Sequence, residues 1–387
     1  MVAASILNLF KESVEFNLAK LLPEFGEKVV TGSAFTQARY KINSGFFRDI
    51  NGLLTGTHRD HIQKTWKGHT LYAGDGSTVN LPPSAGIKSH FGIHSSNKFG
   101  VDRCLARVVF IYNVLDDFVY TGAISKMEKG EKTLLMESLK EMPTDKEGIL
   151  ILDRGFGDFC TIKALMDRQW KTCVRMSVEG SNFAKSAMED ERGDFITEWV
   201  PSEKSKENSR KKGGEHSPVK VRVTKIMLDS GETELLITNL YDRDIYSPED
   251  IGELYSLRWG VEEGFKNLKP KMKLEHFGCR KPEGIYQEFH AHIFCMNLVS
   301  LVGSIANETI QIKTAGRKLE YRYNWKNAYR FVRTRLVAFL TRGRTGELLE
   351  LLYNEISASV ISIKPGRKFN RDMRKSSIKG RITPNYK

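Results

Sequence analysis

Two aspartates that follow apolar segments are the first residues with a chemical signature. Asp75 follows Leu71–Gly74, and Asp153 follows Gly148–Leu152. A carboxylate at the C-terminal end of a strand lies at the rim of a sheet, where open α/β folds bind their ligands. Each has an ordinary alternative, because Asp-Gly is a common turn pair and Asp153 could form a salt bridge where its strand ends. Neither aspartate alone defines a site.

A third carboxylate lies on a predicted helix that begins at Ser247 and ends where Pro270 follows Lys269. Four side chains on this helix are spaced i, i+3, i+7 and i+14, which places them within an arc of ~60° at about 100° per residue. They are Tyr255, Arg258, Glu262 and Lys269. The alternative is an i,i+4 pair of Arg258 and Glu262 on a surface helix, worth roughly 0.2–0.5 kcal/mol. If the stripe faces the rim of the sheet, Glu262 joins the two aspartates.

Three converging carboxylates suit the binding of two Mg²⁺ ions, which prefer oxygen ligands, and Mn²⁺ could substitute. Two such ions about 3.5–4 Å apart activate the attacking oxygen and stabilise the leaving oxygen of an in-line displacement at phosphorus. The candidate catalytic residues and metal ligands are therefore Asp75, Asp153 and Glu262. The candidate phosphate-binding residues on the same helix are Tyr255, Arg258 and Lys269.

The spacing of apolar residues predicts the elements that hold these side chains. The first ~65 residues have helical spacing, and strand-like patterns begin at Thr70. A hairpin is predicted over Arg107–Ala123, a helix over Lys129–Glu141 and a buried strand over Gly148–Asp153. A further helix and strand follow. This order predicts a mixed α/β sheet with helices on its faces.

Residues 178–239 interrupt that order. Strand-like runs are found at Val219–Leu228 and Thr233–Thr238, and the polar segment Glu203–Pro218 predicts a flexible loop. We therefore expect an all-β insertion inside the mixed domain.

Basic charge is concentrated near the C-terminus. The chain has 60 Lys and Arg against 47 Asp and Glu, and Lys313–Lys387 alone holds 19 against 5. With aromatic residues interleaved, this segment indicates a DNA-binding surface, although a solubilising tail would have the same charge. A short helix predicted from Ser33 carries Arg39 and Lys41, which could recognise a DNA end. An ordinary amphipathic helix in a small bundle is the alternative.

Other features exclude several classes of protein. The apolar run Ile293–Ile305 is too short to cross a membrane, and the N-terminus lacks the basic start of a signal peptide. Five scattered cysteines favour a reducing compartment over a disulfide frame or a structural zinc site. The pairs His290/His292 and His90/His94 lack a metal-ligand pattern, and no Gly-rich phosphate loop is present. We expect a soluble cytoplasmic protein without a nucleotide cofactor.

Taken together, these residues resemble a known family. The chain is similar to the DDE transposases of bacterial insertion sequences, a group marked by a Tyr-x2-Arg-x3-Glu-x6-Lys signature. The signature is matched at Tyr255, Arg258, Glu262 and Lys269, and the two aspartate motifs are matched at Asp75 and Asp153. The resemblance extends from the helical N-terminus to the basic C-terminus.

The resemblance implies a ribonuclease H-like catalytic core and Mg²⁺-dependent cleavage at the ends of a transposable element. The freed 3′-OH is then joined to target DNA, with a homodimer holding two ends near the bacterial nucleoid. It also gives Arg175 as a contact to DNA phosphate. The implied domains are a helical DNA-binding domain at 1–66, a core in two parts at 67–177 and 240–312, the insertion at 178–239, and a basic DNA-binding and dimerisation region at 313–387.

One departure from the family puts a single step in doubt. Relatives that form DNA hairpins stack a flipped base on a Trp of the insertion, and this chain has Glu234 at that place. Trp199 lies elsewhere in the insertion and could substitute. Two other functions stay open: a metal-dependent nuclease or resolvase without strand transfer, and a DNA-binding regulator with an inactive centre.

Overall fold

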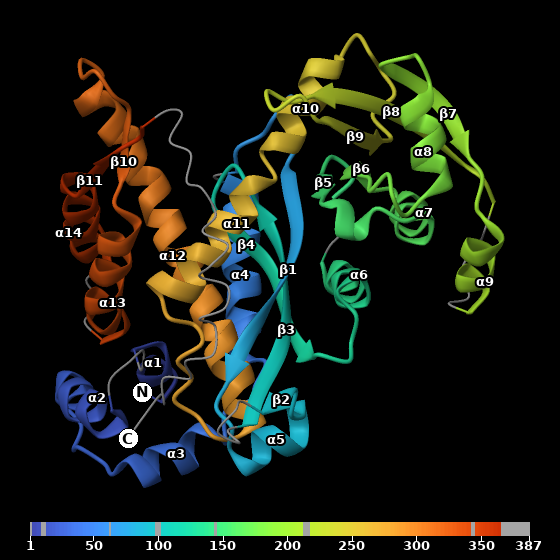
Figure 1. The fold of residues 1–387 in the computed structure, drawn as a ribbon. Helices are drawn as coiled ribbons and strands as arrows, with labels where there is room; N and C mark the ends of the chain where they lie inside the picture. The colour runs from blue at the N-terminus through green and yellow to red at the C-terminus, as the bar shows by residue number, and fades with distance from the viewer. Residues whose placement is uncertain are drawn as a thin grey trace.

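A mixed β-sheet forms the centre of the protein (Figure 1). The computed structural model describes residues 2–8, 13–61, 63–96, 102–142, 145–211, 217–341 and 345–364. In these residues the sheet has nine strands, in the order β2-β3-β1-β5-β6-β9-β8-β7, with β4 paired to β3. The strands are β1 (Leu71–Leu81), β2 (Ser95–Ser96), β3 (Asp102–Asn113), β4 (Phe118–Lys126), β5 (Ile149–Leu152), β6 (Lys171–Arg175), β7 (Asp194–Trp199), β8 (Val219–Met227) and β9 (Thr233–Thr238).

The strand order identifies a ribonuclease H-like core. Strand β1 pairs antiparallel with β3, and β3 pairs antiparallel with β4. On its other side β1 pairs in parallel with β5, which pairs in parallel with β6. The resulting order β4-β3-β1-β5-β6 is that of the core which the resemblance implied. The mixed α/β sheet predicted from the sequence is confirmed.

Helices cover both faces of the sheet. On one face α6 and α7 pack against the even-numbered side chains of β1 and β5, and on the other α10, α11 and α12 pack against the odd-numbered ones. The helices are α1 (Val2–Asn8), α2 (Val14–Leu21), α3 (Gly32–Arg39), α4 (Phe46–His61), α5 (Ala85–Phe91), α6 (Glu131–Glu141), α7 (Phe159–Asp167), α8 (Asn182–Glu189), α9 (Glu203–Lys211), α10 (Pro248–Ser256), α11 (Trp259–Lys266), α12 (Pro282–Thr314), α13 (Trp325–Thr341) and α14 (Thr345–Ala358).

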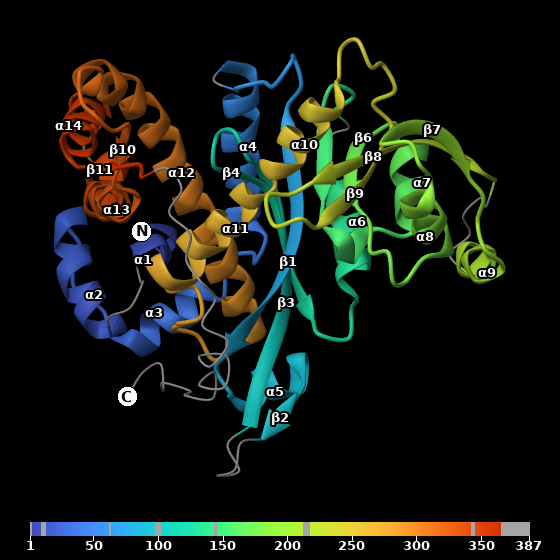
Figure 2. The same ribbon diagram turned by 45° about the horizontal axis from the view of Figure 1, so that its top comes forward.

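The insertion extends the core sheet and is not all-β. Strand β9 pairs antiparallel with β6, so β9, β8 and β7 continue the sheet (Figure 2). Helices α8 and α9 lie within the same stretch of chain, and α9 occupies most of the polar segment that predicted a loop. The all-β prediction was wrong because the sequence of α9 is too polar to show the apolar face by which a helix is recognised. The helix packs against α7, and this tertiary contact cannot be read from the segment itself.

The predicted single helix after Ser247 is divided into three pieces. Helix α10 begins with Ser247 as N-cap and ends at Ser256, where a tightened turn leads into α11. In this turn the Arg258 N–H donates to Tyr255 O at 3.1 Å, three residues back. Beyond α11 the chain continues as a π-helical turn, Asn267–Lys271, that contains Pro270. The wider coil accommodates proline, which cannot donate an N–H, so Pro270 does not end the helix as expected.

Helix α12 is the long core helix of the molecule. Its 33 residues would suffice by length and composition to cross a membrane, which was not expected from the shorter apolar run within it. However, 61% of its most apolar window is buried inside the fold, against α4, β4, α13 and α14. A buried core helix passes the same test, and this burial accounts for its composition. Strand β10 (Tyr321–Tyr323), before α13, and strand β11 (Val360–Ser362), after α14, pair as a small antiparallel sheet.

Candidate active site

The register of the parallel strands places Asp75 and Asp153 side by side. Gly74 in β1 is the partner of Leu152 in β5, and each of these two residues is followed directly by an aspartate. Neighbouring strands are about 4.8 Å apart, and alternation directs both residues to the face that α10 and α11 cover. Asp153 follows the end of β5 as predicted. Asp75 does not end its strand, because β1 continues to Leu81 along β3, and only its pairing with β5 ends there.

The two carboxylates are held in different ways. Asp75 Oδ1 accepts from the Gly76 N–H at 2.8 Å, and Asp153 Oδ1 accepts from the Gly155 N–H at 2.9 Å as the N-cap of a short 3-10 turn. Burial raises the pKa of Asp75 to about 7, and the negative charge of Asp153 adds to this rise. The Gly76 N–H and the guanidinium of Arg258 oppose it. Asp75 therefore keeps its proton to a higher pH than a free aspartate does.

Arg258, the N-cap of α11, forms an ion pair with Glu262 in the first turn of this helix. Arg258 Nη2 donates to Glu262 Oε1 at 3.1 Å, which is the i,i+4 pair considered as the alternative. The pair is not on an open surface: the Arg258 side chain is 7% exposed, and its charge acts on Asp75. Tyr255 is 4% exposed beside Arg258, and burial raises its pKa to about 12. The structure thus shows the Arg258–Glu262 pair with Arg258 buried beside Asp75, and it does not bring Glu262 to the two aspartates.

Lys269 lies farther along the same edge. Its Nζ donates to Ser77 Oγ at 2.5 Å and to Thr78 O at 2.6 Å, two and three residues beyond Asp75 on β1. The π-helical turn shifts Lys269 away from the straight stripe that ideal helical spacing predicted. It nevertheless remains next to the strand that carries Asp75.

Arg175 extends the row of residues across the sheet. Leu152 in β5 is the partner of Val174 in β6, so Arg175 lies beside Asp153 as Asp153 lies beside Asp75. Its Nη1 is 2.8 Å from Glu234 Oε1 in an ion pair.

A metal cluster is not assembled at this rim. Within the part of the chain that the structure describes, no three His, Cys, Asp or Glu side chains come close enough to hold a metal ion. Arg258 binds Glu262, so only the two aspartates share one edge. The donor chemistry still fits a divalent cation: two adjacent carboxyl groups supply oxygen, and a positive charge would offset the burial and mutual repulsion that oppose the ionisation of Asp75.

Two further residues at the rim were not predicted. Glu131, the first residue of α6, lies against β1: a Cβ on Gly76 would be 1.7 Å from Glu131 Oε1, so a larger residue here would force the Glu131 side chain to move. The charge of Glu131 acts on Asp75, and that of Asp153 acts on Glu131. Trp259 follows Arg258 directly and is 55% exposed, with the guanidinium 4.8 Å from its ring. The sequence does show a Trp directly after Arg258 of the motif, whereas the place of Glu131 depends on the packing of α6.

Several other expectations are corrected by burial. Arg39 is 2% exposed, and its Nη1 is 3.0 Å from Glu288 Oε1 on α12, so it does not offer a guanidinium to DNA. Lys41 is exposed and stays a candidate for DNA end recognition. Trp199 stacks on Phe183 and is 5% exposed, so it does not offer a ring to a flipped base. The C-terminal part of the basic region, 365–387, lies outside the described residues.

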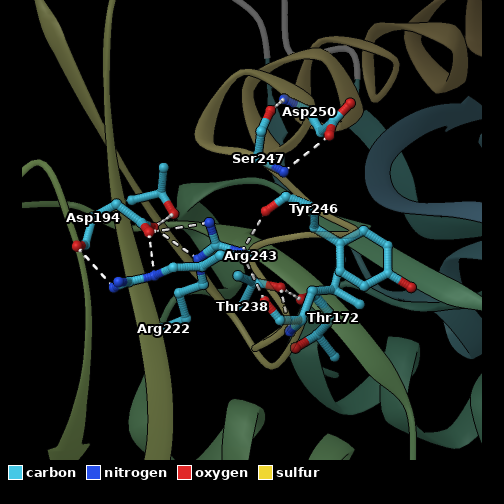
Figure 3. A network of polar contacts seen from close by, with 10 residues as sticks. Thr172, Asp194, Arg222, Thr238, Arg243, Tyr246, Ser247 and Asp250 are labelled. Atoms are coloured by element: carbon cyan, nitrogen blue, oxygen red, sulfur yellow. Dashed lines mark hydrogen bonds and ion pairs between the residues drawn. The ribbon is translucent and has the colours of Figure 1, made fainter.

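A buried arginine fixes the start of α10, which carries Tyr255 and precedes Arg258. Arg222 of β8 is fully buried and donates to both carboxylate oxygens of Asp194, at 2.7 and 3.1 Å (Figure 3). The same guanidinium donates to the carbonyls of Leu240 and Tyr246, at 3.0 and 2.8 Å. Removing one partner of a buried ion pair costs about 3–5 kcal/mol. Arg222 therefore ties the insertion to the segment that leads into α10.

The ribonuclease H-like strand order, with two adjacent aspartates at its rim, is the arrangement expected of a DDE-type domain. The chain belongs to the family described as Transposase DDE domain, whose model matches residues 66–298, more than half of the chain. One similar protein is the transposase InsG for insertion sequence element IS4 of Escherichia coli (strain K12). It is 23% identical over 282 residues, which are 70% of this chain and 60% of InsG.

Among solved structures, the chain is similar to the piggyBac transposase in a synaptic complex with hairpin DNA. The TM-score is 0.41 with 11% identity, covering 80% of this chain and 62% of that one. The ribonuclease H-like assignment rests on strand order and pairing, and this likeness is too remote to add to it. The chain spans about three fifths of the length of both relatives.

Proposed function

We propose that this protein is a DNA transposase that cleaves DNA at the ends of an insertion sequence and joins the freed 3′-OH to target DNA. The observation that carries the proposal is the register match of Asp75 and Asp153, with the charge of Arg258 acting on Asp75 and Arg258 paired with Glu262 of α11. Membership of the transposase family supports the same chemistry. The signature of the bacterial insertion-sequence group is matched at Tyr255, Arg258, Glu262 and Lys269.

Asp75, Asp153 and Glu262 would hold the divalent cations, for which we propose Mg²⁺ with Mn²⁺ as a substitute. Bound there, the cations would activate the attacking oxygen and stabilise the leaving oxygen at phosphorus. Glu262 becomes free to do so when Arg258 turns from it to a phosphate. Arg258 has a donor left for a phosphate, because its buried Nε has no hydrogen-bond partner among the described residues. A phosphate accepts two parallel N–H bonds from arginine.

The remaining cations of the rim would position the DNA backbone. Lys269, now held by Ser77 and Thr78, lies along β1 where a strand that reaches Asp75 would pass. Lys41 and the basic C-terminal region would add contacts to DNA outside the catalytic rim. We infer a homodimer that holds two DNA ends, acting in the bacterial cytoplasm at the nucleoid. We also propose the domain divisions that the resemblance to the transposase family implied.

The test uses a plasmid that carries the DNA flanking this gene in its genome, with purified wild-type protein and Asp153→Asn. We expect cleavage and joined products only with wild type and a divalent cation, while the variant binds the same DNA with similar affinity. Cleavage by Asp153→Asn at the wild-type rate would contradict the assignment. Cleaved ends without joined products would indicate a nuclease, and binding without cleavage would indicate a regulator.

A further inference from the structure

The ion pair between Arg175 and Glu234 lies at the rim of the proposed active site. Parallel pairing of β1, β5 and β6 places Asp75, Asp153 and Arg175 in one row. The turn after Asp153 packs directly on this end of β6, because a Cβ on Gly157 would be 2.7 Å from Arg175 O. A DNA phosphate bound near the two aspartates would therefore be close to the guanidinium of Arg175.

Arg175 already has an anionic partner in the protein. Its Nη1 is 2.8 Å from Glu234 Oε1 on β9, and β9 is the antiparallel neighbour of β6. The Glu234 side chain is 12% exposed and that of Arg175 is 31% exposed, so solvent reaches the cation more than the carboxylate. Tyr255 of α10 is close enough to feel both charges, which places the pair at the edge of the helix that also precedes Arg258.

We propose that Glu234 masks Arg175 as an internal substitute for phosphate, and that a DNA phosphodiester displaces Glu234 when the active site is occupied. This inference rests on the proposed function, because the ligand is DNA. Carboxylate and phosphate both accept two N–H bonds from a guanidinium, so one anion can replace the other at similar geometry. Arg175 stays partly exposed while it is paired, so a phosphate can approach its guanidinium before Glu234 leaves.

Masking has a measurable effect on DNA binding. A phosphate that must first displace Glu234 adds less affinity than a phosphate that meets an unpaired cation. Without the carboxylate, Arg175 should engage DNA in full, and each added phosphate contact steepens the dependence of log K on log salt by about 0.9. The chain would thus keep low affinity for DNA in general until other contacts place a strand at the rim.

The experiment is a double-mutant cycle on Glu234→Gln and Arg175→Ala, measured by fluorescence anisotropy with a labelled 30-bp duplex. EDTA is present so that no cleavage occurs, and salt is varied. Glu232→Gln is the matched control, because it removes the same charge two residues away at an exposed position. We expect Glu234→Gln to bind about tenfold tighter than this control at low salt, and the gain to vanish when Arg175→Ala is present.

The outcomes separate the two proposals. If wild type does not bind the duplex at any salt concentration, the proposed function fails. If wild type binds but Glu234→Gln equals Glu232→Gln, masking is wrong while the proposed function stands. A gain that persists in the Arg175→Ala background also overturns masking, since it would reflect net charge alone. Circular dichroism melting of each variant shows that the comparison concerns folded protein.

Discussion

Replacing Asp75 by asparagine should make the metal-free protein more stable at neutral pH. The pKa of this carboxyl rises from 3.8 to about 7 on folding, mainly through burial. Because the folded-state value is the higher one, stability is fully present below pH 3.8 and is lost as the pH rises to about 7. At about 1.36 kcal/mol per pH unit, the loss has an upper limit of ~4 kcal/mol. Asp75 keeps partial contact with solvent, so we expect roughly half of this.

The assay is urea unfolding of wild type and Asp75→Asn in EDTA from pH 4 to pH 8. The difference in free energy of unfolding should grow in favour of the variant across this range and level off above about pH 7. Asp229→Asn serves as the control, because it removes the same charge from an exposed turn. A difference that stays flat with pH would refute the reasoning that burial of Asp75 opposes its ionisation.

Adding Mg²⁺ should reverse the order of the two proteins. A ligand that binds only the folded state stabilises it by RT ln(1 + [L]/Kd), which is about 2.7 kcal/mol at a hundred times Kd. Wild type should gain this stability, whereas Asp75→Asn lacks one proposed ligand and should gain little. Equal stabilisation of both would exclude Asp75 as a ligand without any measurement of activity.

Two further predictions concern the residues that the sequence did not single out. Gly76→Ala should destabilise the protein by about 1–3 kcal/mol, because its Cβ would meet Glu131 Oε1, and Glu131→Ala should rescue it in a double variant followed by urea unfolding. No rescue would show that another contact dominates. Trp259→Ala should change stability by at most about 0.5 kcal/mol, since the ring is exposed, but should weaken binding of single-stranded DNA by about 1–3 kcal/mol in anisotropy titrations. Unchanged affinity would assign Trp259 no role in stacking.

Periodicity predicted most of the core because its strands are locally distinctive. The hairpin of β3 and β4, the buried β5 and helix α6 all have patterns that identify them without tertiary information. Strand β1 was harder, because Asp75-Gly76 has the local chemistry of a turn. The ladder to β3 from Tyr72 to Leu81 keeps this segment extended, and a pairing so distant in sequence cannot be read from the segment itself.

The candidate site was predicted in its residue types but not in its geometry. The i,i+4 spacing of Arg258 and Glu262 allowed either a mutual pair or a shared face toward the sheet; the structure shows the mutual pair, with Arg258 buried beside Asp75. Spacing assumes a straight helix, so it could not place Lys269 within a π-helical turn. Likewise Arg39 and Lys41 look alike in sequence, and only the packing of α3 on α12 separates a buried ion pair from an exposed cation.

The position of α12 late in the chain has a consequence for biosynthesis. Arg39 and Glu288 are 249 residues apart, yet α3 and α4 complete their burial only against α12. At about 5–20 residues per second, a ribosome needs roughly 12–50 s to make the intervening chain. During that interval the nascent N-terminal helices lack the partner that covers their apolar side. The native packing of α1 and α4 on α12 can therefore form only after the ribosome has completed the strands of the central sheet.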